Sequence, residues 1–299
     1  MYENILQTIG NTPIVKINKS NPNKNVDIYA KLEGFNPTGS IKDRIALKMI
    51  NQAVTDGKLN KNKTIIEATS GNTGIALAMI GSVKNIKIEI VMSEAVSIER
   101  RIMIESFGAK IRLTNAKQGT DGAIKKVKEL IKKHPDKYFN PNQFSNKNNP
   151  LAHYKTTAEE IWHQVNGNID YFVSAIGTSG TIMGIGKSLK ENNPNIKIVE
   201  AHPAKGHYIQ GLKNMEEAIV PEIYKSSEID ESIIVNSEEA LITAREIIKN
   251  EGIFIGMSSG AAMYAALKIA KNIKKGRIVV AFSDRGEKYL STELFKLKQ

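Results

Sequence analysis

The chain has 299 residues, 41% of them hydrophobic and 24% charged, so it is long enough to bury a sizeable core in one or two closely joined domains. It contains no cysteine, which excludes disulfide frameworks, thiolate metal sites and a cysteine nucleophile. The net charge of +11 comes mostly from lysine, with 35 Lys against 7 Arg, whereas nucleic-acid readers rely on arginine and stacked aromatics, so we expect no nucleic-acid partner.

Apolar segments with strand character alternate along the chain with segments whose apolar residues have a helical spacing. In chain order we predict helix 42–55, strand 64–68, helix 72–83, strand 87–92, helix 97–107, strand 110–114, helix 119–133, helix 157–165, strand 171–176, helix 180–191, strand 197–201, helix 238–250, helix 260–272 and strand 277–282. This alternation is typical of parallel sheets with helices on both faces, so the predicted fold class is α/β.

The segment 140–150 interrupts this pattern, because it is polar and rich in Asn, Pro and Ser. Such residues favour turns over regular structure. We therefore predict a boundary between two units of the chain in this segment.

Neither a secretory signal nor a membrane span is visible. Met1–Asn4 has no basic region followed by an apolar run. The longest uncharged stretches, 68–83, 171–186 and 252–267, have 16 residues each, and a spanning helix needs about 20. We expect a cytoplasmic protein that does not bind a membrane.

Four turns of small and hydroxyl-bearing residues lead into predicted helices. They lie at 37–44 (PTGSIKDR), 69–74 (TSGNTG), 177–181 (GTSGT) and 256–260 (GMSSG). The start of a helix offers backbone N–H groups and a positive dipole end to anions. One such turn suits a single phosphate, whereas four beside Lys42 indicate a crevice that holds several anionic groups next to a reactive amine. This combination suggests Schiff-base chemistry with pyridoxal phosphate.

Other motif readings fail. The end of a nucleotide-binding loop at Gly186-Lys187-Ser188 lacks its first glycine, since position 181 is threonine. The pattern around Ser258 fits a hydrolase nucleophile, but that order needs a later histidine, and all five histidines precede Ser258. His202 and His207 form a pair with no third ligand in view, so we predict no metal site and expect both side chains to be solvent-exposed.

From residue 9 onward the chain resembles the cysteine synthases (O-acetylserine sulfhydrylases), over essentially its whole length. The matching segments are 9–13 (IGNTP), 31–33 (KLE), 36–44 (NPTGSIKDR), 67–74 (EATSGNTG), 177–181 (GTSGT) and 283–292 (SDRGEKYLST). The chain is most similar to the B isozyme at residues 152–157 (AHYKTT), 160–162 (EIW) and 284–286 (DRG), and in the short connection between Pro203 and Pro221.

The resemblance implies the tryptophan-synthase-β fold, which is type II among pyridoxal-phosphate enzymes. Two three-layer αβα domains with largely parallel, twisted sheets are then expected. The smaller, mobile domain would comprise residues 36–146, and the larger domain residues 1–35 plus 147–299 and would bind the cofactor phosphate. A homodimer is also implied.

The resemblance also implies a role for each matching residue. Lys42 would bind pyridoxal phosphate as a Schiff base and act as the catalytic base, Asn72 would contact the ring 3′-oxygen, and Ser258 would face the ring nitrogen. The phosphate would lie on Gly177, Thr178, Ser179, Gly180 and Thr181. The substrate carboxylate would bind to Thr69, Ser70, Gly71, Thr73 and Gln143.

The implied reaction is a β-replacement that makes L-cysteine from O-acetyl-L-serine and sulfide, or thiosulfate, through an aminoacrylate intermediate. The residues leave open a related β-replacement or β-elimination enzyme, namely an O-phosphoserine sulfhydrylase, a lanthionine or cystathionine synthase, or a cysteine desulfhydrase. A catalytically silent protein that binds pyridoxal phosphate is a further alternative.

Three positions depart from the B isozyme. Lys213 and Asn214 stand where that isozyme tends to have arginines, which predicts weaker handling of bulky anionic sulfur donors and of a phosphorylated serine substrate. Ser283 stands where it can have a cysteine, so Ser283 competes with Ser258 as the partner of the ring nitrogen. Because the longer loop of the A isozyme is absent, we expect serine acetyltransferase not to dock.

Overall fold

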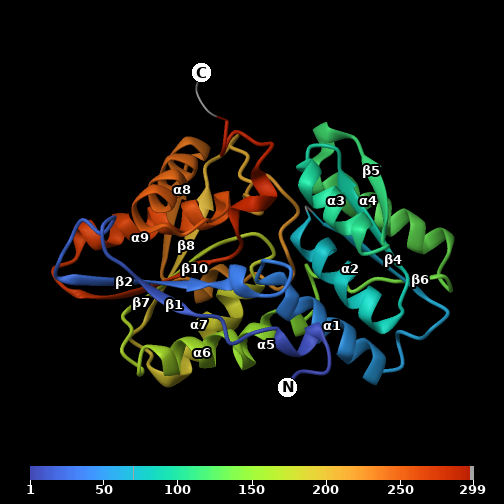
Figure 1. The fold of residues 1–299 in the computed structure, drawn as a ribbon, viewed down its shortest axis with the longest axis horizontal. Coiled ribbons are helices and arrows are strands. Elements are labelled where there is room, and N and C mark those ends of the chain that lie inside the picture. Colours follow the sequence, from blue (N-terminus) through green and yellow to red (C-terminus); the bar gives the residue numbers. More distant parts are fainter. Residues whose placement is uncertain (70, 297–299) are drawn as a thin grey trace.

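Two separate sheets form the framework of the molecule (Figure 1), in a computed structural model that describes residues 1–69 and 71–296. The four-stranded sheet has the order β5-β4-β3-β6, and each of its strand pairs is parallel. Its strands are β3 (Thr64–Ala68), β4 (Ile88–Ser93), β5 (Lys110–Thr114) and β6 (Tyr138–Phe139).

The six-stranded sheet has the order β1-β2-β10-β7-β8-β9. Its strands are β1 (Ile14–Ile17), β2 (Val26–Leu32), β7 (Tyr171–Ala175), β8 (Lys197–Pro203), β9 (Glu231–Val235) and β10 (Gly276–Phe282). All neighbouring pairs are parallel except β1 and β2, which are antiparallel with Ile14 opposite Lys31. The four strands of the smaller sheet therefore end at one edge of that sheet, and the strands of the larger sheet other than β1 end at one edge of theirs. Ligands bind at such edges in folds of this kind.

Helices cover both faces of the four-stranded sheet. Successive strand residues point to opposite faces, so Ile65 packs in the core beneath α1 (Lys42–Thr55), α2 (Asn72–Lys84) and α3 (Ile98–Ser106), whereas Ile66 packs beneath α4 (Gly119–Lys133). All four helices thus bury an apolar face against this one sheet.

The six-stranded sheet has the same three-layer construction. Ile278 and Val280 of β10 lie in the core with α8 (Ser237–Glu251) and α9 (Met257–Asn272), whereas Val279 lies in the opposite core with α6 (Thr157–Gln164) and α7 (Gly180–Asn192). Helix α5 (Asn148–Lys155) packs between α7 and α1, and its Ala152 joins a small core with Ile45 of α1. The predicted αβα fold class is confirmed.

Several helices and strands were not predicted from the sequence. Strands β1, β2, β6 and β9 and helix α5 were not predicted, and α5 begins at Asn148, inside the segment interpreted as a boundary. Helix α9 begins three residues earlier than predicted, at Met257. The strands of the smaller sheet fall within 36–146, and those of the larger sheet fall outside it; the mobility of the smaller unit stays a prediction. None of the helices in the described part of the chain is long and apolar enough to cross a membrane.

Candidate active site

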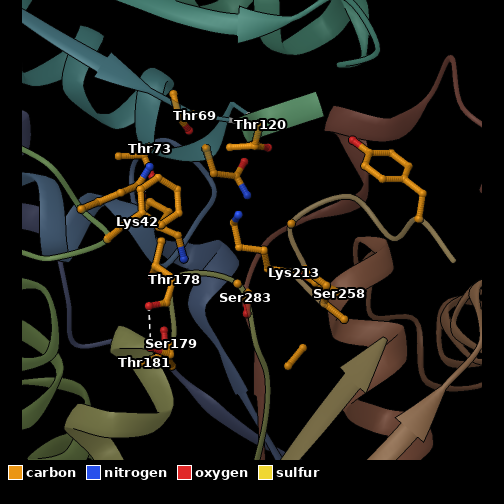
Figure 2. A pocket seen from close by; sticks show the side chains of 18 residues that line it. Lys42, Thr69, Thr73, Thr120, Thr178, Ser179, Thr181, Lys213, Ser258 and Ser283 are labelled. Carbon is orange, nitrogen blue, oxygen red and sulfur yellow. Dashed lines mark hydrogen bonds between the residues drawn. The ribbon is translucent and has the colours of Figure 1, made fainter. Parts of the chain in front are cut away.

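A pocket lies between the two sheets, and most of its walls are strand ends and helix starts (Figure 2). Thr69, Thr73 and Thr120 line it from the side of the four-stranded sheet, and Thr178 and Ser258 line it from the six-stranded side. The complete lining is Lys42, Thr69, Asn72, Thr73, Thr120, Gln143, Phe144, Ala175, Gly177, Thr178, Ser179, Thr181, Tyr208, Gly211, Leu212, Lys213, Ser258 and Ser283.

Ten of the thirteen predicted site residues line this pocket. They are Lys42, Thr69, Asn72, Thr73, Gln143, Gly177, Thr178, Ser179, Thr181 and Ser258. Gly71 and Gly180 lie in the same turns but not in the lining. Ser70 lies outside the described residues. The four turns identified in the sequence therefore converge, although they are far apart along the chain.

Lys42 is the first residue of α1 and lies in the pocket wall. The turn before it bends at Gly39, whose φ of 76° suits glycine, and the N–H of Ile41 donates to the Ser283 carbonyl at 2.9 Å. Burial lowers the pKa of the Lys42 ammonium to about 8, and the charges of Asp284 and Glu33 oppose that shift. An amine with this pKa is neutral often enough near pH 8 to act as a nucleophile or a base.

The turn from β7 to α7 is shaped to receive an anion. Ser179 has a left-handed backbone conformation with a φ of 68°, immediately before the first turn of α7. Strained backbone of this kind clusters at ligand sites. The hydroxyls of Thr178, Ser179 and Thr181 are close to this helix start, and all three residues line the pocket. Together with the helix dipole they could bind a phosphate.

Two residues of α5 make hydrogen-bond contacts with this turn, and neither was predicted from the sequence. Asn149 is fully buried, and its Nδ2 donates to Thr178 Oγ1 at 3.1 Å and to the Gln143 carbonyl at 2.8 Å. His153 lies 3.3 Å from Thr181 Oγ1 and 3.0 Å from Thr157 Oγ1. Burial and the charges of Lys42 and Arg44 hold the pKa of His153 well below 6.5, so its imidazole is neutral at pH 7. The asparagine-rich run before Pro150 was the available signal, but it resembles a loop.

The loop after β3 faces the other side of the pocket. Thr69 Oγ1 accepts the N–H of Gly71 at 3.1 Å, which tightens the turn. Thr73 Oγ1 donates to Gln143 Oε1 at 2.7 Å, and Gln143 Nε2 donates to the Ala68 carbonyl at 3.1 Å. Hydroxyls, a side-chain amide and the start of α2 therefore meet where a small carboxylate could bind.

Asn72 connects the pocket to a buried polar group behind it. Its Nδ2 donates to Asp284 Oδ2 at 2.7 Å, and the Tyr289 hydroxyl donates to the same oxygen at 2.7 Å. The Oδ1 of Asn72 is buried and accepts no hydrogen bond from the described residues. A buried acceptor without a donor is costly, so a ligand hydroxyl beside Asn72 would stabilise this arrangement. Sequence reasoning gave Asp284 and Tyr289 no role.

Ser258 and Ser283 both line the pocket, from the start of α9 and from the end of β10 respectively. Gly211, with a φ of 98°, lies opposite Ser258, and a Cβ at that glycine would lie 3.7 Å from the Cβ of Ser258. The assignment of Ser258 to the ring nitrogen stays a prediction.

The two histidines considered as a metal pair are occupied by local contacts. His202 Nε2 accepts the N–H of Met215 at 3.2 Å, and His207 Nδ1 lies 2.8 Å from Ser237 Oγ. The expectation that both are exposed was wrong for His202, which is 7% exposed because it lies within β8. Among the described residues, no group of three or more His, Asp or Glu side chains could hold a metal ion.

Comparison with known proteins gives a consistent result. Residues 5–284 match the family model described as pyridoxal-phosphate dependent enzyme. The chain is 47% identical to a cysteine synthase of Aquifex aeolicus, with 99% of this chain and 93% of that protein covered. It is 42% identical to cysteine synthase B of Escherichia coli, with 97% and 95% covered.

Solved structures agree in fold. O-acetyl serine sulfhydrylase isoform 3 from Entamoeba histolytica has a TM-score of 0.91 and 43% identity, covering 100% of this chain and 93% of that one. A hydrogen sulfide-producing enzyme from Fusobacterium nucleatum has a TM-score of 0.92 and 45% identity, covering 97% and 100%.

Proposed function

This chain belongs to the pyridoxal-phosphate dependent enzymes, and from that premise we propose that it makes L-cysteine and acetate from O-acetyl-L-serine and sulfide. The observation that carries the proposal is the half-buried Lys42, which shares one pocket with two helix starts rich in hydroxyl groups. The names of the cysteine synthases and of the O-acetyl serine sulfhydrylase that the chain resembles support this reaction.

The pocket residues fit pyridoxal phosphate. The start of α7 with Thr178, Ser179 and Thr181 would hold the phosphate, and the unpaired Asn72 Oδ1 would accept a hydrogen bond from the ring hydroxyl. Ser258 would face the ring nitrogen, and Lys42 would carry the covalent attachment. Bound pyridoxal phosphate supplies an electron sink that weakens the bond between the substrate α-carbon and its proton.

Side chains of the protein would bind the substrate and remove its α-proton. Thr69, Thr73 and Gln143 would bind the substrate carboxylate and so fix the direction of the α-proton. The Lys42 amine, released when the substrate amine takes its place, would remove that proton. Acetate leaves the β-carbon, and sulfide adds to the same carbon. Closure of the smaller unit would keep water out during these steps.

The first experiment is a visible absorbance spectrum of the purified protein, before and after addition of O-acetylserine and then of sulfide. A cofactor band that shifts with O-acetylserine and returns with sulfide, together with cysteine found by chromatography, would establish the reaction. A band that O-acetylserine leaves unchanged would refute this substrate and favour phosphoserine, serine or cysteine. The Lys42→Ala variant is the control, and it should show neither the original band nor turnover.

Release of sulfide from cysteine is a second candidate, because a hydrogen sulfide-producing enzyme is among the similar structures. The same protein incubated with cysteine alone distinguishes the two. Sulfide released faster than cysteine is made from O-acetylserine would assign the second function.

We further propose that the enzyme is a cytoplasmic homodimer. Ile98 and Ile102 are exposed one turn apart on α3, and Leu290 is exposed beside Ser291, which bonds to Glu99 of the same helix. Exposed apolar groups of this kind are typical of subunit interfaces. Sedimentation velocity should give about twice the chain mass, and cell fractionation tests the compartment.

We also propose that a serine acetyltransferase does not dock on this enzyme. Calorimetry with the C-terminal peptide of a serine acetyltransferase should show no binding.

A further inference from the structure

A second lysine lies in the wall of the same pocket. Among the described residues that line it, Lys42 and Lys213 are the charged ones, and Figure 2 shows both amines directed into the space between the two halves. The Lys213 side chain is 8% exposed, and its backbone N–H donates to the Ile176 carbonyl at the end of β7 at 2.9 Å. Its position is therefore fixed by the six-stranded sheet.

The Lys213 ammonium is already paired. Its Nζ lies 2.6 Å from Asp121 Oδ1, and the second oxygen, Oδ2, accepts the N–H of Ile219 at 3.1 Å. Asp121 lies in the first turn of α4, next to the pocket residue Thr120. The ion pair therefore joins a helix of the four-stranded sheet to the connection between β8 and β9 of the six-stranded sheet.

This pair determines which charge an incoming second substrate meets. Lys42 is needed for the reaction itself, so Lys213 is the cation available to attract an anion into the pocket. A carboxylate at 2.6 Å neutralises most of that attraction. A free ammonium attracts a dianion more strongly than a monoanion. The Lys213–Asp121 ion pair therefore weakens the binding of a dianion more than that of a monoanion.

We propose that Asp121 sets the choice of sulfur donor, because it holds Lys213 in an ion pair and so favours hydrosulfide over dianionic thiosulfate. The inference rests on the proposed cysteine synthesis. In both reactions the β-carbon loses its bond to the acetate oxygen and gains one to sulfur, without oxidation or reduction. Hydrosulfide gives cysteine and acetate, and thiosulfate gives S-sulfocysteine and acetate.

The test uses the holoenzyme and the Asp121→Asn variant. Freed from its partner, Lys213 should bind thiosulfate, so the ratio of kcat/KM for thiosulfate to kcat/KM for sulfide should rise about tenfold. The dissociation constant for thiosulfate, measured by calorimetry without O-acetylserine, should fall by a similar factor. Glu129→Gln is the matched control, because Glu129 is an exposed acid of the same helix, paired with Lys126. It should change neither quantity.

A double variant, Asp121→Asn with Lys213→Met, removes both charges and leaves no unpaired one. It should return the donor ratio to within about twofold of the wild-type value. A single variant without a gain for thiosulfate would overturn the proposal, and so would a double variant whose ratio falls about tenfold below wild type. If the wild type makes no cysteine, the proposed function fails, and the calorimetric comparison still decides whether Asp121 masks Lys213.

Discussion

The position of Lys42 inside the pocket controls when its amine can react. Burial lowers its pKa to about 8, against an ordinary value of 10.5, and the nearby Asp284 and Glu33 charges only partly compensate. At pH 7 about nine in ten molecules therefore carry the ammonium form, and at pH 9 about nine in ten carry the neutral amine. A lysine in water would need a pH more than two units higher to reach the same state.

We predict that uptake of pyridoxal phosphate by the apoenzyme accelerates with pH, because only the neutral amine attacks an aldehyde. The rate should rise roughly fivefold to tenfold between pH 7 and pH 9 and then level off. Stopped-flow absorbance measures it, with Lys48→Arg on the same helix as a control that leaves the profile unchanged. A rate that continues to rise toward pH 10.5 would show that burial does not lower the pKa of Lys42.

At the scale of elements, the turn between β7 and α7 depends on its contact with α5. A Cβ placed on Gly180 would lie 1.9 Å from the Asn149 Oδ1, and one on Gly177 would lie 2.3 Å from the Gly211 carbonyl oxygen. Backbone and buried amide atoms have little room to move. The glycines therefore let the turn approach α5 and the loop after β8, and these neighbours hold it in place.

We predict that Gly180→Ala weakens the binding of pyridoxal phosphate roughly tenfold or more, because Asn149 must move and its bonds to Thr178 and Gln143 must lengthen. Fluorescence titration of the apoenzyme measures the affinity. Lys187→Ala, an exposed change on α7, is the control. An unchanged affinity in Gly180→Ala would mean that α5 does not position the turn.

Helix α5 and its contact with this turn could not be predicted from the sequence. The alternation of strands and helices predicted the α/β class, and the small-residue turns predicted which residues line the pocket. Asn149 and His153 were missed because the run 146–149 has the composition of a loop, although it leads into α5, which packs against α7 and α1. Asp284 and Tyr289 were missed as well, because their partners are distant in sequence. Asn72 is 212 residues from Asp284, and Arg100 is similarly far from Tyr289.

Glu67 is a buried carboxyl at the end of β3, before the loop that faces the substrate side. Burial raises its pKa to about 8, although backbone N–H groups of Gln143, Asn142 and Ala68 oppose the shift. A raised pKa in the folded state means that the folded protein binds the proton more tightly than the unfolded chain. The stabilisation is complete below the unfolded pKa of 4.5 and is lost as the pH rises through about 8.

We predict that Glu67→Gln removes part of the loss of stability between pH 7 and pH 9. The melting temperature of the wild type should fall by a few degrees relative to the variant over this interval, since only the wild type must ionise a buried group. Thermal unfolding of the apoprotein at each pH measures the difference. Glu105→Gln, at an exposed position of α3, should give curves parallel to the wild type. Parallel curves for Glu67→Gln would contradict the prediction.

At the scale of the whole molecule, the segment after β10 joins the two halves on the side of α3. Ser97 Oγ donates to the Lys288 carbonyl at 2.7 Å, and Ser291 donates to Glu99 at 2.6 and 2.8 Å. Between these contacts the fully buried Arg100 guanidinium lies 4.6 Å from the Tyr289 ring centroid. Together with the Lys213–Asp121 pair, these contacts connect the four-stranded half to the six-stranded half.

Arg100 and Asp284 form the most buried ion pair across this junction. Their charged atoms are 3.5 Å apart, and both side chains are 0% exposed. Two buried charges stabilise a fold only when they compensate each other, so removal of one charge takes that compensation away from the other. Asp284 also accepts the Asn72 amide, so the junction and the pocket share one carboxylate.

We therefore predict strong coupling in a double-mutant cycle of Arg100→Gln and Asp284→Asn. Each single change should destabilise the apoprotein by about 3 kcal/mol, and the double variant by less than the sum, with a coupling free energy of about 1–3 kcal/mol. Urea unfolding measures each term. The exposed Lys225–Glu228 pair is the matched comparison, and its coupling should stay below about 1 kcal/mol. If the Arg100–Asp284 coupling were as small, the other contacts between the halves rather than this ion pair would hold them together, and the hydrogen bonds from Asn72 and Tyr289 would position the Asp284 carboxylate.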